Sequence, residues 1–179
     1  KLMSALDTVT STVTVQGSTI NKRNLALTQT EFVGDVRIKA VLASSSTLSV
    51  QWEKPTGTVD SYNLYLSENG VTWDSLPRVS PAGTAVSASV GGLESNKQYY
   101  VRIRAKNSIS ESPNFSRTYG GYTSNSQDKV LIVDGFNRIT GSSSNPAHNY
   151  AAIYGDALAA MNFKFETVSN LTITGAAQL

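Results

Sequence analysis

Three side chains in the last third of the sequence could support chemistry: Asp134, Arg138 and His148. Asp134 ends an apolar run, and open α/β sheets place their ligand crevices at the carboxyl ends of such strands. Asp134 could therefore be an acid or a metal ligand assisted by Arg138, or it could cap a turn and pair with Arg138. His148 is the only histidine. It could act as a base, bind an anion, or cap the helix expected after it.

The sequence contains no complete catalytic or metal-binding set. Cysteine is absent and histidine occurs once, so thiolate sites are excluded and a zinc site lacks ligands. No nucleophile elbow, Walker loop, dinucleotide fingerprint or His-Glu-x-x-His motif occurs. We therefore expect no metal and no cofactor, and we do not expect this chain to be an enzyme on its own.

A second group of side chains could bind a ligand. Trp73 and Tyr65 could form an aromatic platform that stacks on sugars, although Trp73 could equally cover one end of a core. Arg102, Arg104 and Lys106 alternate on one face of a strand, where they could meet the acid groups of a polysaccharide or form a solvated outer face. The net charge of +2 is too small to indicate nucleic acid as a partner.

The elements expected over residues 35–123 are short alternating strands separated by turn residues, which is typical of an antiparallel β-sandwich. Asn69-Gly70 is a hairpin signal, so we expect a strand through Trp73 after it. The last strand is expected around residues 115–122. Because turn residues separate these strands, the pattern predicts a single domain over this region.

Spaced residues in this region resemble the fibronectin type III domain. They are Trp52, Tyr62, Leu64, and Leu93 six residues before a run containing Tyr99, Val101 and Ile103. The resemblance implies a β-sandwich with a tyrosine corner, in which the Tyr99 hydroxyl satisfies a buried backbone group. It also implies interaction or spacing and not catalysis. The Arg-Gly-Asp tripeptide of some animal members is missing, so integrin binding is not expected.

After a Ser/Asn-rich linker at residues 124–128 the pattern changes. Lys129 to Asp134 reads as a buried parallel strand, and residues 163–168 read as a second strand. Between them Asn149 can cap a helix with a continuous apolar stripe: Tyr150, Ile153, Tyr154, Ala157, Leu158 and Met161. A parallel, right-handed strand-helix-strand unit is expected, and alone it would leave one sheet face and both edges uncovered.

Residues 129–170 resemble a group of secreted bacterial multidomain proteins described as N-acetylmuramoyl-L-alanine amidase or xanthan lyase-like. The resemblance lies in Val-Leu-Ile-Val-Asp-Gly-Phe-Asn-Arg, Tyr-Gly-Asp-Ala-Leu and Phe-Glu-Thr-Val-Ser-Asn. It implies that residues 129–179 begin a flavodoxin- or glutamine-amidotransferase-like α/β domain of a cell-wall or polysaccharide-degrading protein. The expected fold class is thus mainly β, a sandwich followed by a partial α/β unit.

Residues 1–34 read as an arm or linker with one strand at residues 9–15. If other copies cover the open edges of the C-terminal unit, this strand is a ready donor and the chain would form a homo-oligomer. The composition lacks cysteine and is rich in serine and threonine, which favours export to a bacterial surface. No stretch approaches the ~20 apolar residues of a membrane span. A start at Lys1 suggests a piece of a longer protein.

Three functions follow as hypotheses. The first is a non-catalytic interaction and spacer module that contacts polysaccharide, peptidoglycan or other domains of its parent protein. The second is the beginning of a hydrolase domain with a crevice near Asp134. The third is a self-assembling surface subunit that uses strand donation.

Overall fold

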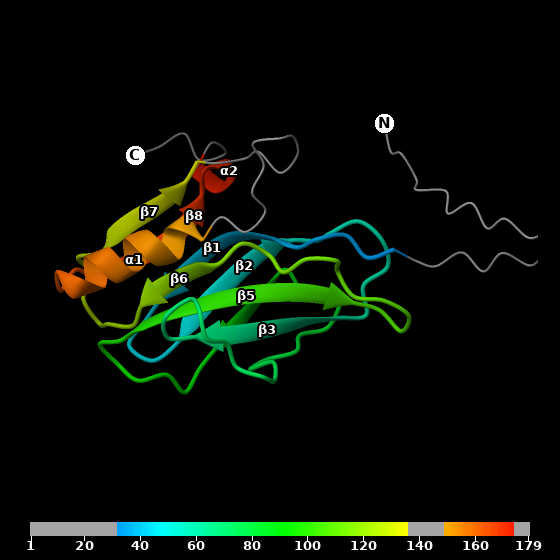
Figure 1. Ribbon diagram of the computed structural model, residues 1–179, viewed down its shortest axis with the longest axis horizontal. Helices are drawn as coiled ribbons and strands as arrows, with labels where there is room; N and C mark the ends of the chain where they lie inside the picture. Colours follow the sequence, from blue (N-terminus) through cyan, green and yellow to red (C-terminus); the bar gives the residue numbers. More distant parts are fainter. Residues whose placement is uncertain (1–31, 136–148, 174–179) are drawn as a thin grey trace, which may run out of the picture.

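The computed structural model describes residues 32–135 and 149–173, which form eight strands and two helices (Figure 1). Residues 1–31 of the expected arm, with its strand at residues 9–15, lie outside the described residues, as do Arg138 and His148. Val33, part of the expected arm, is instead buried in the core of the sandwich. The elements are β1 (Arg37–Ala43), β2 (Leu48–Glu53), β3 (Ser61–Ser67), β4 (Ser87–Val90), β5 (Gln98–Lys106), β6 (Tyr119–Tyr122), β7 (Val130–Asp134), α1 (Tyr150–Ala160), β8 (Phe165–Ser169) and α2 (Asn170–Ile173).

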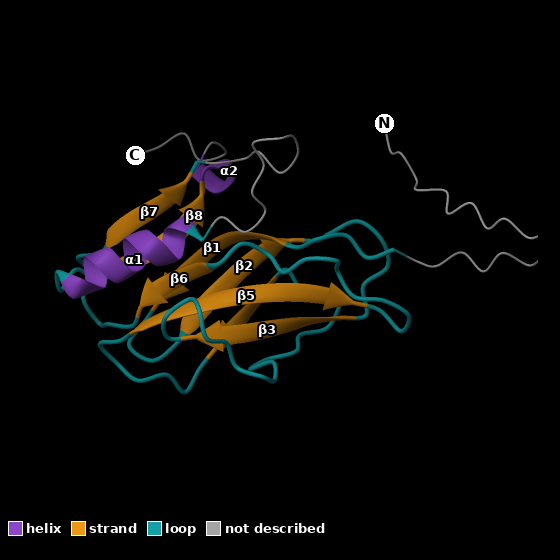
Figure 2. Cartoon of the chain, in the orientation of Figure 1, coloured by secondary structure: helices purple, strands orange, loops and turns teal. Residues whose placement is uncertain are grey.

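Two sheets face each other. One is antiparallel with the order β3-β5-β6, and the other has the order β4-β2-β1-β8-β7. Both helices of the described chain lie at the C-terminal unit, whereas the rest consists of strands and loops (Figure 2). The expected fold class, a mainly β sandwich followed by a strand-helix-strand unit, is confirmed.

The core lies between the sheets because alternate residues of each strand point inward. Trp52 of β2 contacts Tyr62 of β3, with ring centroids 5.0 Å apart. Burial removes the Tyr62 hydroxyl from water and raises its pKa, since the ionised form loses hydration. The inward residues include all those that carried the family resemblance: Trp52, Tyr62, Leu64, Leu93, Tyr99, Val101 and Ile103.

A tyrosine corner closes the turn before β5. The Tyr99 hydroxyl accepts a hydrogen bond of 3.1 Å from the backbone N–H of Glu94, and Leu93 beside it is buried. Asn96 turns the chain with a φ of 59°, a conformation that asparagine tolerates better than most residues. This bond satisfies an N–H that has no sheet partner.

The expected strand through Trp73 is wrong. The Asn69 side chain accepts hydrogen bonds from the N–H groups of Val71 and Thr72 at 2.9 and 2.8 Å, which is an Asx turn. These N–H groups are therefore not available to a sheet, and Trp73 lies in a loop. The neighbour of β3 is instead a short segment that pairs through Val79 and Ala82.

The C-terminal unit extends the sandwich. β7 and β8 are parallel as expected, with Ile132 opposite Thr167. The expectation of two open edges is wrong, because β8 also pairs antiparallel with β1, with Ala40 opposite Val168. Of the two strands of this unit, β7 alone has an outer edge without a neighbouring strand in the described chain.

Helix α1 shows most of its expected stripe to solvent, which corrects the predicted orientation; Leu158 is the member of the stripe that packs inward. Ile153 and Tyr154 are 62% and 60% exposed, whereas Ala151, Ala152 and Gly155 are buried. The cause is close packing: a Cβ on Gly155 would lie 2.5 Å from the ring of Phe165 and 2.7 Å from the Tyr100 hydroxyl. Only small residues fit there, so the large apolar side chains point away. Asn149 precedes the helix without a side-chain cap.

Strand β7 is less buried than its apolar sequence predicted. Val130, Leu131 and Val133 are between 38% and 46% exposed. Helix α1 covers one face of β7 and β8 (Figure 1). The opposite face of β7 has no layer over it in the described chain, which is why the prediction of a buried strand is wrong.

The fit at Gly155 makes a testable prediction. Gly155→Ala should lower the free energy of unfolding by about 1–3 kcal/mol, because overpacking outweighs the ~1 kcal/mol that alanine contributes to helix propensity. Gly91→Ala is the control, since the atom nearest to its Cβ, the Thr47 hydroxyl oxygen, would lie 3.9 Å away. Urea unfolding of both variants measures the difference. Equal stability of the two variants would refute the close packing of α1.

Candidate functional site

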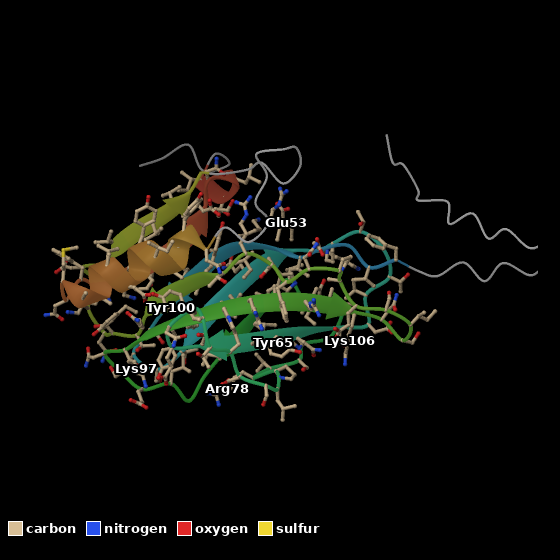
Figure 3. All side chains as sticks on the ribbon, in the orientation of Figure 1. Glu53, Tyr65, Arg78, Lys97, Tyr100 and Lys106 are labelled. Atoms are coloured by element: carbon tan, nitrogen blue, oxygen red, sulfur yellow. The ribbon has the colours of Figure 1, made fainter. Side chains whose placement is uncertain are left out.

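The outward face of β5 carries the side chains that could bind a ligand. Arg102 and Arg104 alternate with the buried Val101 and Ile103, and Tyr65 of β3 lies directly opposite Arg102. Figure 3 labels Tyr65 on this face, between Tyr100 and Lys106. The strand period therefore collects the basic residues and one aromatic residue on one surface.

Arg102 is surrounded by rings. Its guanidinium carbon lies 3.7 Å from the ring centroid of Phe115, 4.3 Å from that of Trp73 and 5.9 Å from that of Tyr65. Arg104 contacts the same Phe115 ring, and its guanidinium carbon lies 4.0 Å from the ring centroid. We call these five residues the arginine–aromatic ladder: Tyr65, Trp73, Arg102, Arg104 and Phe115. Such cation–π contacts hold a guanidinium in a fixed orientation.

Two loops position the outer rings of the ladder. The Asp74 N–H donates to the Leu66 carbonyl at 3.0 Å, which anchors the loop beside Trp73. On the other side the Ser116 N–H donates to the Ile103 carbonyl at 2.9 Å and fixes the loop that carries Phe115. Phe115 and Tyr65 then meet edge to face, with centroids 5.4 Å apart.

The structure brings Trp73 and Tyr65 to one site and corrects two expectations about their surroundings. Arg102 and Arg104 do not form a simple solvated face, because rings partly cover both side chains. Phe115 was assigned to the last strand, but β6 begins only at Tyr119, so Phe115 is free to fold over the sheet. An isolated aromatic residue within a polar loop was the available signal.

The two arginines differ in their partners. Arg104 forms an ion pair of 3.4 Å with Glu111 and donates to the Pro113 carbonyl at 3.2 Å. Arg102 has no acidic partner among the residues that the structure describes. The Nε atoms of both arginines are enclosed without a hydrogen bond. Burial, and secondly the charge of Arg104, lower the pKa of Arg102, although an arginine remains protonated at neutral pH.

Asp134 lies at a second candidate site. Its carboxylate accepts from Arg117 at 3.0 Å and from the Tyr119 hydroxyl at 2.9 Å. Burial and the negative charge of Asp134 raise the pKa of Tyr119. Arg138 and His148, the expected companions of Asp134, are outside the described residues. Neither Arg117 nor Tyr119 could be predicted, because their approach depends on β8 joining β1.

Within residues 32–135 and 149–173 no group of three His, Cys, Asp or Glu side chains could hold a metal ion. The same residues include no helix long and apolar enough to cross a membrane. The chemistry that the described site offers is recognition by rings and guanidinium groups.

Comparison with known proteins assigns the first part of the described chain. Residues 33–119 match the model of the Fibronectin type III domain. Contactin-3 from Rattus norvegicus is 33% identical over 96 residues, and contactin-3 from Mus musculus is 34% identical over 96 residues. Each match covers 51% of this chain and 9% of the contactin, so the chain spans only a small part of these relatives.

Two solved structures are similar to part of the chain. The fn3 domain of human contactin 1 has 21% identity and a TM-score of 0.46, with 74% of this chain and 99% of that chain covered. FN3tt has 24% identity and a TM-score of 0.43, with 53% of this chain and 99% of that chain covered. The family match, the two facing sheets and the tyrosine corner agree, and residues 33–119 are a fibronectin type III domain.

Proposed function

We propose that this chain is a non-catalytic interaction and spacer module of an exported bacterial protein that processes cell wall or polysaccharide, and that the arginine–aromatic ladder binds a glycan. The observation that carries the proposal is the cluster of three partly exposed rings around a guanidinium that has no acidic partner in the described chain. Rings contact the apolar faces of sugars, and a guanidinium binds their oxygen atoms.

The sandwich supports a binding role because it holds the ladder rigidly. β3 and β5 pair over seven residue positions, and Tyr65 and Arg102 lie in the middle of that register. A ligand would therefore meet side chains that are already ordered, which reduces the entropy cost of binding. The ladder forms a surface and not a deep cleft, so we expect an extended ligand and modest affinity.

The attached C-terminal unit supports a spacing role. β8 continues the sheet of the domain, and α1 packs over Tyr100 of β5, so the two parts are joined by more than a flexible linker. Ser124, in the segment expected to be a linker, donates its N–H to the Ser44 carbonyl at 2.9 Å. A module built in this way would hold its neighbours at a fixed distance and orientation.

Trp73→Ala tests the binding role. It should lower the affinity for an insoluble polysaccharide or peptidoglycan about tenfold, because one face of the ligand site is lost. Val71→Ala is the matched control, since Val71 lies in the same loop and is fully outside the ladder. Pull-down isotherms on peptidoglycan sacculi and on an acidic polysaccharide measure both. If the native chain binds neither material, the glycan proposal is rejected.

A second candidate function is the beginning of a hydrolase α/β domain, and one observation favours it. Asp134 and Ser169 end two adjacent parallel strands and lie opposite each other in register. The carboxyl ends of parallel strands are the usual place for a ligand crevice. The free outer edge of β7 is also where a flavodoxin-like order would continue. Self-assembly by strand donation has less support, because β1 already pairs with β8.

Asp134→Asn tests the hydrolase candidate. If Asp134 is catalytic, the substitution should abolish hydrolysis of peptidoglycan or polysaccharide by the parent protein. It should also lower stability, because Asp134 is paired with Arg117. Arg117→Gln is the control that breaks the same ion pair but keeps the carboxylate. Similar losses of stability with activity lost only in Asp134→Asn would support catalysis; full activity in Asp134→Asn would reject it.

A further inference from the structure

We propose that the ligand of the ladder is a glycan that carries carboxylate groups, and that Arg102 is the residue that binds the carboxylate. This inference rests on the proposed glycan-binding function and adds the chemical class of the ligand. Its basis is the unequal pairing of two neighbouring arginines that share one aromatic ring.

Arg102 lacks the acidic partner that Arg104 has. The guanidinium of Arg104 has an acid, Glu111, whose carboxylate lies 3.4 Å away, whereas no acidic side chain of the described chain lies within ion-pair distance of Arg102. An arginine cannot lose its proton at neutral pH. Arg102 therefore keeps a positive charge that the described fold leaves unpaired, in surroundings that exclude part of its hydration.

Two aromatic rings fix the orientation of the Arg102 guanidinium. The rings of Phe115 and Trp73 lie 3.7 and 4.3 Å from the Arg102 guanidinium carbon, so the group has little freedom to turn. A planar guanidinium that is fixed in this way presents its N–H donors as a fork that matches a carboxylate. A carboxylate bound there would also be screened less by water than at a freely exposed arginine.

The strand pairing around the ladder favours a sugar polymer over a peptide. An acidic peptide that bound by strand addition would need a free sheet edge beside the ladder. The outer side of β3 is already paired, through Leu64 with Val79 and through Ser61 with Ala82. On its other side β5 pairs with β6, and the Ser116 N–H donates to the Ile103 carbonyl next to Arg102, so neither edge of β5 is free beside the ladder. Rings and a single guanidinium suit a sugar acid, which needs no backbone partner.

A matched pair of soluble glycans tests the inference with the full native chain. Tetragalacturonate carries carboxylates, and its fully methyl-esterified form keeps the sugars but has no charge. Isothermal titration calorimetry should show at least about tenfold tighter binding of the acid, since a charge-assisted hydrogen bond contributes that much. Added NaCl should weaken the binding of the acid and leave the binding of the ester unchanged.

Variants assign the effect to Arg102. Arg102→Gln should lower the affinity for the acid to that of the ester, and Arg102→Lys should lose most of the preference because lysine keeps the charge but not the fork. Lys106→Gln is the control, since it removes one positive charge from the same face of β5 outside the ladder. It should change the affinity less than twofold.

The outcomes separate this inference from the proposed function. Equal binding of acid and ester by the native chain, or native-like preference in Arg102→Gln, would overturn the inference while glycan binding stands. Tighter binding of tetraglutamate than of tetragalacturonate would also overturn it, in favour of an acidic peptide. Binding of none of these probes would reject the proposed glycan function and the inference with it. The comparison of acid and ester needs no variant, so it holds even if Arg102→Gln does not fold.

Discussion

The packing of α1 on Tyr100 is the interaction on which the arrangement of the described chain depends. Tyr100 points outward from β5, where a sandwich normally has a polar residue, yet it is fully buried. Its hydroxyl donates to Asp156 at 2.7 Å, and burial together with the Asp156 charge raises its pKa. A buried tyrosine needs such a partner because its hydroxyl has lost water.

This contact also links the two sheets. Tyr100 stacks beside Phe165 of β8, with centroids 6.2 Å apart, while Thr167 of the same strand donates to the Gly120 carbonyl of β6 at 2.7 Å. Glu166 accepts from Lys129 and from the Ala43 N–H, both at 2.8 Å, and so joins β8 to β1 and to the start of β7. Neither β8 nor α1 would have these partners without the sandwich. The outward face of β5 is thus divided between the helix over Tyr100 and the rings over Arg102.

The sandwich could be predicted from the sequence because its strands alternate with period two and its corner residues have fixed spacing. The orientation of α1 could not, since its apolar stripe and its small-residue face are both continuous, and only the closeness of Phe165 selects Gly155. The ladder was predicted in part: Trp73 and Tyr65 stand out by type, but their meeting with Phe115 depends on two loops. The partner of Asp134 depends on a pairing between β1 and β8, strands that are separated by most of the described chain, and local patterns do not encode such pairings.

The contacts of β8 and α1 imply that the fibronectin type III domain and the β7-α1-β8 unit fold as one body. Native-state hydrogen exchange of the full chain tests it most directly, because it reports the opening free energy of each strand separately. The structure predicts that the amides of β8 exchange with the same free energy as those of β5, through a shared global opening. An opening free energy for the β8 amides that is several kcal/mol lower than that of the β5 amides would contradict this prediction. It would show that the unit opens on its own.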